Sequence, residues 1–143
     1  MGKSLVYVIS AGNTKKQVTT VHASVTTKDS KKTFILWNDK DWDAIEDAFT
    51  DDVVYHNIPM EPLNGKAAAV AAIRAMQPQE VDWRVLHIAA NGDAVLTERV
   101  DDFVMQDGKK VSLPVMGTME LEDGKIKAWR DYFDLPSFTS QMA

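Results

Sequence analysis

Three Asx-Gly dipeptides follow one another in the second half of the chain, at Asn91-Gly92, Asp107-Gly108 and Asp123-Gly124. An Asn or Asp followed by Gly tolerates the positive φ angles that tight primed β-turns require. The segments between these dipeptides have strand length, and apolar and polar residues alternate along them. The pattern predicts an antiparallel meander of four strands joined by short turns, at about 80–90, 94–105, 110–121 and 125–134.

The segments upstream predict helices and one further strand. Residues 52–58 have strand character, and residues 66–76 are strong helix formers. Two earlier helices are expected at about 29–38 and 42–49. This order is an α+β pattern. We expect a curved, mixed but mostly antiparallel sheet with helices packed on one face, which would enclose a conical pocket suited to a small apolar ligand.

The N-terminal segment leaves two interpretations open. Leu5–Ile9 and Gln17–Thr27 are rich in Val and Thr, so they could form two strands around a turn at Ala11-Gly12-Asn13. They could equally belong to a loosely attached tail. We therefore assign residues 1–27 to an N-terminal extension and residues 28–143 to a single domain.

Composition narrows the class of protein. The chain has 143 residues, of which 45% are apolar and 26% are charged, and these values favour one soluble globular domain. Its formal net charge of -5 disfavours nucleic acid and anionic membrane surfaces as partners. The absence of cysteine rules out disulfides and fits a cytoplasmic location. No apolar run approaches the roughly 18 residues that a membrane span needs.

Strand alternation places several polar residues among apolar neighbours. Arg99 and Asp101 share one face of the second meander strand with apolar residues. Asp131 has a large aromatic residue on either side along its face of the last strand. Tyr55 and Asn57 also share a face of their strand. These five residues are the candidates for chemistry.

The ordinary interpretation of an Arg–Asp pair on a strand is a surface salt bridge, which contributes about 0–1 kcal/mol. The interpretation changes if the charged faces converge inside the protein, because buried charge is costly unless it is paired. Two carboxylates beside one guanidinium are then expected to retain one proton as a coupled pair. The ionised carboxylate can act as a base on water, and the protonated one as an acid on a leaving oxygen. Opening an epoxide needs both, and we expect it to require no metal and no organic cofactor.

Three local motifs carry a family resemblance. They are Tyr55-His56-Asn57-Ile58-Pro59, Thr97-Glu98-Arg99-Val100-Asp101 and Trp129-Arg130-Asp131-Tyr132-Phe133-Asp134-Leu135. Their order and spacing resemble those of the limonene-1,2-epoxide hydrolase family over roughly residues 30 to 138. The resemblance implies an NTF2-like or SnoaL-like fold, a cystatin-like roll. It also implies hydrolysis of a small hydrophobic epoxide to a vicinal diol, and a homodimer.

The resemblance also assigns roles to the five candidates. Asp101 is expected to be the base that activates water, and Asp131 the acid that protonates the epoxide oxygen. Arg99 is expected to bridge the two carboxylates and fix their geometry. Tyr55 and Asn57 are expected to help hold the water.

Six further residues are candidates for the lining of the substrate pocket. Ordinary core packing is the alternative interpretation for each of them, since apolar residues of these types fill any core. The expected set is Leu113, Val115, Phe103, Met76, Trp83 and Leu86.

Two alternative functions on the same fold stay open at this point. An enzyme like a ketosteroid isomerase or a polyketide cyclase would shuttle a proton with one Asp. Arg99 argues against it, because a bridging cation would hold that base ionised and occupied. A non-catalytic module that binds small molecules would not need paired acids on inward faces. The partners we expect are a small hydrophobic epoxide and water.

Overall fold

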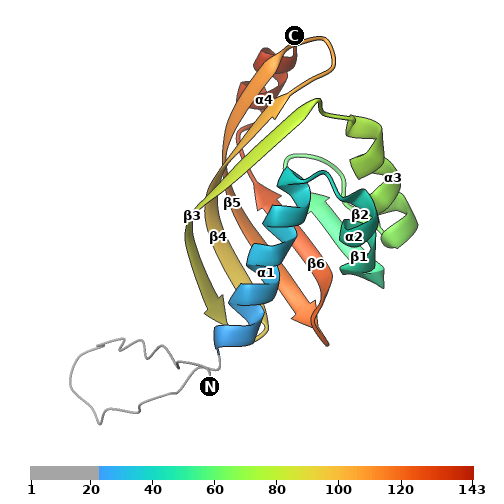
Figure 1. Ribbon diagram of the computed structural model, residues 1–143, viewed down its shortest axis with the longest axis vertical. Coiled ribbons are helices and arrows are strands. Elements are labelled where there is room, and N and C mark those ends of the chain that lie inside the picture. The colour runs from blue at the N-terminus through green and yellow to red at the C-terminus, as the bar shows by residue number, and fades with distance from the viewer. Residues whose placement is uncertain (1–22) are drawn as a thin grey trace, which may run out of the picture.

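The structure, a computed structural model, describes residues 23–143 (Figure 1). This part of the chain forms six strands and four helices, in the order α1-α2-β1-β2-α3-β3-β4-β5-β6-α4. The helices are α1 (Ala23–Asn38), α2 (Trp42–Asp47), α3 (Lys66–Met76) and α4 (Leu135–Met142). The strands are β1 (Phe49–Asn57), β2 (Leu63–Asn64), β3 (Glu80–Asn91), β4 (Ala94–Val104), β5 (Lys110–Glu122) and β6 (Lys125–Tyr132).

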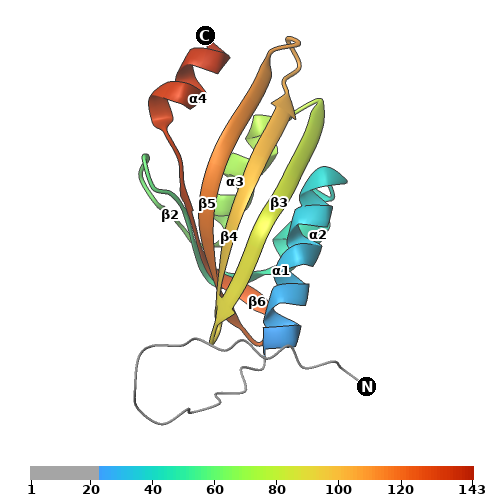
Figure 2. The same ribbon diagram turned by 90° about the vertical axis from the view of Figure 1, so that its left-hand side faces the viewer.

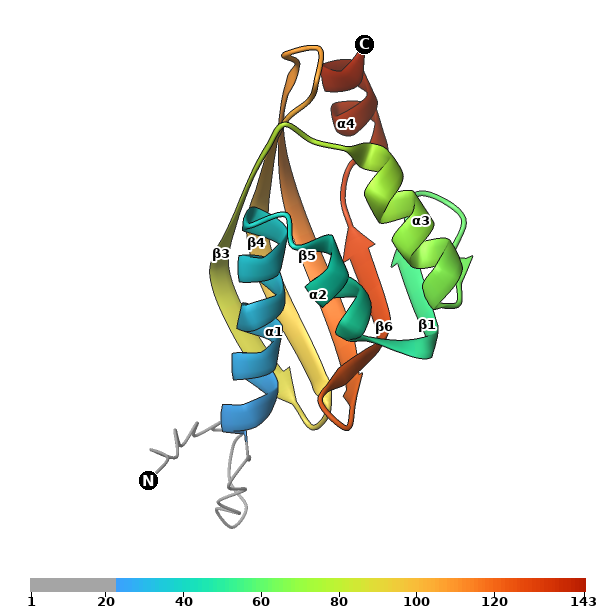
Figure 3. The same cartoon turned by 45° about the vertical axis from the view of Figure 1, so that its right-hand side comes forward.

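The strands form one sheet in the order β2-β1-β6-β5-β4-β3. Only the β1–β6 pair is parallel, and the other pairs are antiparallel. Helices α1, α2 and α3 lie over one face of the curved sheet (Figure 3). Figure 2 shows β3, β4 and β5 from the opposite side, where these helices lie behind or beside the strands. The prediction of a mixed, mostly antiparallel sheet covered on one face is confirmed.

The four meander strands agree closely with the ranges predicted from the Asx-Gly spacing. At the β5–β6 turn, Asp123 and Gly124 have φ angles of 49° and 76°. Both residues are therefore left-handed, as a type I′ hairpin turn requires. Because these turns keep the hairpins tight, residues far apart in sequence meet in a fixed register across β4, β5 and β6.

The structure differs from the sequence expectations at three places. Helix α1 begins at Ala23, so of the two interpretations left open for residues 17–27, the strand is wrong for residues 23–27. The helix that these residues begin packs Phe34 and Trp37 into the core, and such packing outweighs the weak helix propensity of Val and Thr. The strand at Leu5–Ile9 and the start of the 17–27 segment lie outside the described residues. Strand β1 begins earlier than expected, at Phe49, and α4 was not expected at all.

The core lies between the covered face of the sheet and the helices. Its largest fully buried apolar side chains include Trp37, Phe49 and Trp129. Along β4, residues 95, 97, 99, 101 and 103 are buried while the residues between them are not, as the period-two pattern predicts. Within residues 23–143, no helix is long and apolar enough to cross a membrane.

Candidate active site

Arg99 joins two carboxylates that come from different strands. Its Nε donates to Asp101 Oδ1 at 2.8 Å, and its Nη2 donates to Asp101 Oδ2 at 3.0 Å. The same Nη2 donates to Asp131 Oδ2 at 2.5 Å. The three residues are only 1%, 3% and 3% exposed. The charged faces of β4 and β6 therefore converge inside the protein, and the surface salt-bridge interpretation is wrong.

Gly117 on β5 provides the space in which these side chains meet. It lies opposite Asp131 in the β5–β6 register and opposite Thr97 in the β4–β5 register. A Cβ at this position would collide with Arg99 Nη1 and Asp131 Oδ1. The strand between the two carboxylates must therefore lack a side chain at this one point.

Aromatic rings surround the guanidinium on the helix side. The Arg99 Cζ lies 5.0 Å from the ring centre of Trp83, 5.2 Å from that of Phe34 and 5.9 Å from that of Trp129. The indole Nε1 of Trp129 also donates to Asp131 Oδ1 at 2.8 Å. Asp131 thus accepts one hydrogen bond on each oxygen, from Trp129 and from Arg99.

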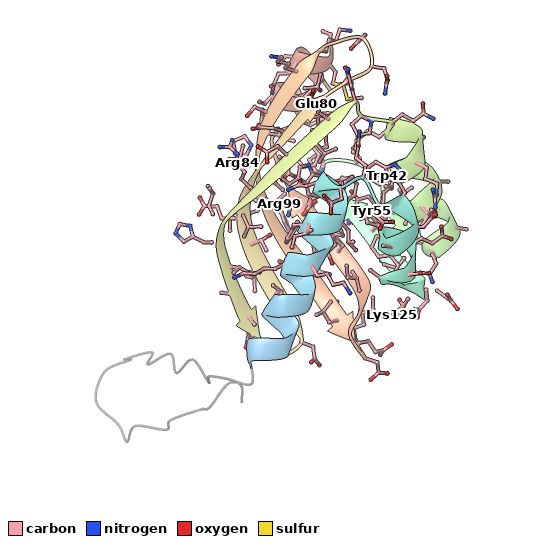
Figure 4. The ribbon with its side chains drawn as sticks, in the orientation of Figure 1. Trp42, Tyr55, Glu80, Arg84, Arg99 and Lys125 are labelled. Carbon is pink, nitrogen blue, oxygen red and sulfur yellow. The ribbon has the colours of Figure 1, made fainter. Side chains whose placement is uncertain are left out.

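The parallel pairing of β1 with β6 brings Tyr55 and Asn57 next to the buried cluster of Arg99, Asp101 and Asp131. Tyr55 lies opposite Trp129, and Asn57 lies opposite Asp131. Figure 4 shows Tyr55 and Arg99 on the side of the sheet that the helices cover. The register places this polar pair beside Asp131, whereas Asp101 lies two strands further along the sheet.

Burial changes the acidity of the cluster. It raises the pKa of Asp101 to about 7, because the loss of hydration outweighs the attraction of Arg99. Burial also raises the pKa of Tyr55, and the negative charge of Asp131 adds to this rise, so Tyr55 stays a neutral phenol. For Arg99, burial lowers the pKa, but the two carboxylates more than reverse that effect and it stays a cation.

A cavity of about 360 Å³ opens above the two carboxylates. Tyr55, Asn57, Asp101 and Asp131 line it, while Arg99 lies behind them with a fully buried side chain. The lining is otherwise largely apolar. It also contains five of the six residues expected from the sequence, namely Leu113, Val115, Phe103, Met76 and Trp83.

Leu86 is the exception, and its assignment to the pocket is wrong. Its side chain is 51% exposed and lies outside the cavity. The register of β3 against β4 shifts between Val85 and His87, which leaves Leu86 without a partner in a β-bulge. On β3 the inward positions before the bulge are odd-numbered, as at Trp83, and those after it are even-numbered, as at Ile88. The bulge turns Leu86 to the outer face.

Sequence reasoning missed several lining residues near the cavity mouth. They come from the β1–β2 connection, from β2, from α3 and from α4, and they are Met60, Glu61, Leu63, Ala72, Ile73 and Phe138. A signal for α4 was present in the sequence. Asp134 caps the helix by accepting from the Ser137 backbone N–H at 2.8 Å, and Pro136 follows in the first turn.

Comparison with known proteins defines first the fold class and then the family. A SnoaL-like protein from Shewanella putrefaciens is 16% identical to the chain and superimposes with a TM-score of 0.72 over 82% of this chain and 95% of that one. This likeness shows the SnoaL-like, NTF2-like fold. A family model for the limonene-1,2-epoxide hydrolase catalytic domain matches residues 27–143. The chain belongs to the limonene-1,2-epoxide hydrolase family.

Two relatives come from Mycobacterium tuberculosis. The epoxide hydrolase EphG is 36% identical over 97 residues, which span 67% of this chain and 64% of that protein. The chain thus matches somewhat less than two thirds of the length of this relative. A structure of an LEH-like epoxide hydrolase has 29% identity and a TM-score of 0.74, over 83% of this chain and 90% of that one.

Proposed function

We propose that the protein hydrolyses a small hydrophobic epoxide to a vicinal diol in one step, without a cofactor, through Asp101, Arg99 and Asp131. The observation that carries the proposal is the pair of buried carboxylates bridged by one guanidinium at the base of an apolar cavity. Membership of the family supports the reaction class. Buried charge of this kind is seldom favourable for stability alone, which points to a chemical role.

The geometry favours roles for the two carboxylates that reverse those expected from the resemblance. Burial raises the pKa of Asp101 to about 7, which favours the protonated form that an acid needs. Asp131 accepts from both Trp129 and Arg99, and these donors stabilise its negative charge. We therefore assign Asp101 as the acid and Asp131 as the base.

The water site follows from this assignment. Asn57 lies opposite Asp131 in the parallel register, and Tyr55 lies one inward position earlier on β1. A water bound by these three side chains loses its proton to Asp131 as its oxygen attacks an epoxide carbon. The carbon–oxygen bond of the ring breaks, and Asp101 gives its proton to the leaving oxygen. Both protons move in one step, and the diol forms without a covalent link to the protein.

The test is diol formation from terpene, cyclic and aryl epoxides by the purified protein. Asp131→Asn and Asp101→Asn should each lower kcat by at least about 10²-fold, the lower range for loss of a general acid or base. Asp102→Asn is the matched control, because Asp102 follows Asp101 but lies outside the cavity, where it pairs with Arg84 at 2.8 Å. A folded Asp131→Asn or Asp101→Asn variant with full activity would contradict the assignment.

Heavy-oxygen water separates this route from a covalent one. In the one-step route, the oxygen added in a single turnover comes from solvent, so the diol carries the label at once. Single-turnover diol that carries an unlabelled second oxygen, taken from a carboxylate, would overturn the one-step mechanism.

The proposal extends to a homodimer formed through the outer face of the sheet. Leu96, Met116 and Tyr132 are 43%, 51% and 49% exposed on that face, and Met116 lies opposite Tyr132 in the β5–β6 register. Exposed apolar side chains that lie together mark an interaction surface. Sedimentation should show a dimer that Met116→Lys dissociates. Ile35→Lys, on the exposed side of α1, is the control that should leave it intact, and a monomeric wild-type protein would contradict the assembly.

A further inference from the structure

The cavity wall is unusually rich in aromatic rings. The chain has four Trp, three Tyr and five Phe residues. Six of these twelve line this one cavity, so half of the aromatic content of the protein surrounds a single small space. They are Trp37, Tyr55, Trp83, Phe103, Phe133 and Phe138.

The rings form two groups with defined geometry. Beside the proposed acid, Trp83 stacks on Trp37 at 4.3 Å and meets Phe103 edge to face at 5.6 Å. At the end of β6, Phe133 meets Phe138 of α4 edge to face at 6.1 Å. The two groups lie on different elements, so a ligand that extends from the carboxylates can contact both.

The register fixes the first group next to the reacting oxygen. Trp83 lies directly opposite Asp101 in the β3–β4 pairing, and Phe103 follows Asp101 on the same inward face. An epoxide whose oxygen receives the proton of Asp101 can therefore place a substituent against these rings. Aromatic rings prefer offset-stacked or edge-to-face partners, and such pairs are worth more than their buried area alone.

The size of the cavity limits this substituent. An engineered cavity of about 150 Å³ accommodates one benzene molecule. The cavity here, at about 360 Å³, has room for about two such rings. The geometry and the size together admit an epoxide with one or two small rings attached.

From these contacts we infer that the preferred substrates are aryl-substituted epoxides, whose flat ring meets Trp83 edge-on and packs against Phe103. The faces of Trp83 are covered by Trp37 and Arg99. This inference rests on the proposed epoxide hydrolysis, since it names the substrate class of the same site. The reaction is unchanged: water adds to one epoxide carbon, the ring bond breaks and Asp101 protonates the oxygen. An aryl substituent adds a chemical advantage, because it stabilises the partial positive charge that develops on the attached carbon as the ring opens.

Two non-reacting amides test recognition separately from turnover. Benzamide and cyclohexanecarboxamide differ only in whether the six-membered ring is aromatic or saturated. Their amide groups can donate to an ionised carboxylate and accept from a protonated one. We expect benzamide to bind about threefold to tenfold more tightly by calorimetry, which corresponds to one or two favourable ring pairs. Equal affinities, or tighter binding of the saturated ring, would overturn the inference.

Substitutions locate the source of the preference. Phe103→Leu and Phe138→Leu keep an apolar side chain but remove a ring from one group each, so each should reduce the benzamide preference. Leu121→Met is the control, because it changes a buried aliphatic residue outside this cavity at nearly constant volume, and it should keep the benzamide preference. If both Phe variants keep the wild-type ratio of affinities while folded, the rings are core packing and the inference fails.

Turnover of a matched pair of epoxides then distinguishes this inference from the proposed function. The ratio of kcat/KM for phenyloxirane to that for cyclohexyloxirane should fall in Phe103→Leu relative to wild type, because intrinsic reactivity cancels between the two proteins. Hydrolysis of both epoxides with an unchanged ratio would refute the aryl preference alone. Benzamide selectivity without hydrolysis of either epoxide would refute the reaction and leave the recognition intact.

Discussion

The proposed mechanism gives different roles to Asp101 and Asp131, although both are aspartates, because their surroundings differ. Both oxygens of Asp101 accept from Arg99, and burial raises the pKa of Asp101 to about 7, whereas Asp131 has an indole donor that Asp101 lacks. Sequence alternation placed both carboxylates on strand faces with apolar neighbours, but it left open whether those faces lie inside the protein. It could not predict their roles, because these depend on which neighbours each carboxylate meets across strands.

Trp129 is expected to position the base. Trp129→Phe keeps an aromatic ring but removes the 2.8 Å hydrogen bond to Asp131. A hydrogen bond to a charged group contributes about 1.5–3 kcal/mol, so kcat should fall by roughly tenfold to 100-fold while KM changes little. Steady-state kinetics with one epoxide measures both constants.

Trp37→Phe is the matched control for this prediction. Trp37 is as deeply buried as Trp129, but among the described residues its Nε1 has no hydrogen-bond partner. The substitution therefore removes the same atoms without removing a hydrogen bond to the cluster. Equal losses of kcat in the two variants would show that lost packing, and not the hydrogen bond, explains the effect.

Gly117 should be intolerant of even one methyl group. In Gly117→Ala the new Cβ meets Arg99 and Asp131, so the carboxylate must move away from its position. Overpacking of this kind costs about 1–3 kcal/mol, and a displaced base should lower kcat/KM by about 10²-fold. Gly92→Ala is the control: its turn has a φ of 59° and open space, so it should lose stability and keep activity. Full activity in Gly117→Ala would contradict the packing argument.

At the scale of elements, one amide adds a polar contact between the end of α1 and the sheet to the apolar packing of Phe34 and Trp37. Strand β3 is an edge strand, and Asn38 at the end of α1 pairs with its free backbone at Trp83. The Trp83 N–H donates to Asn38 Oδ1 at 2.8 Å, and Asn38 Nδ2 donates to the Trp83 carbonyl at 3.2 Å. Asn38→Ala leaves both backbone groups unpaired, which should lower the free energy of unfolding by about 1–3 kcal/mol in urea titrations.

Gln141 offers a comparison for the Asn38 prediction. Its side chain pairs in the same way with the Ser112 backbone on β5, accepting at 2.8 Å and donating at 3.2 Å. These groups are exposed, so water can replace the lost partner in Gln141→Ala. We expect a smaller loss of stability than in Asn38→Ala. A larger loss would mean that α4, and not α1, is the more important helix for stability.

The elements that were predictable are those with local signals. The Asx-Gly dipeptides predicted the meander, and the alanine-rich run 66–76 predicted α3 with the bounds that the structure shows. The bulge at Leu86 has no local signal, because it is a property of how β3 and β4 pair. The Val- and Thr-rich start of α1 suggested a strand instead, but the packing of Phe34 and Trp37 further along the helix outweighs that local propensity.

At the scale of the whole molecule, the raised pKa of Asp101 should govern the pH dependence of both activity and stability. An acid must be protonated to donate, so kcat/KM should fall as pH rises through about 7. For stability, the folded carboxyl keeps its proton up to about pH 7, whereas the unfolded one loses it near 3.8. The contribution of Asp101 to the free energy of unfolding is therefore fully present below about pH 4 and is lost as pH rises to about 7.

The expected slope follows from proton linkage. Between these pH values the folded protein holds one proton that the unfolded chain has lost, so the free energy of unfolding should decrease by up to about 1.4 kcal/mol per pH unit. Urea unfolding at several pH values between 4.5 and 8 measures this slope. Asp101→Asn cannot titrate and should flatten the slope. Asp102→Asn removes only the weakest of the influences on the pKa of Asp101 and should keep a slope close to that of wild type. If the free energy of unfolding of wild type and of Asp101→Asn depended on pH in the same way, the titrating proton would lie on another group. The role of Asp101 as the acid would then have no physical basis.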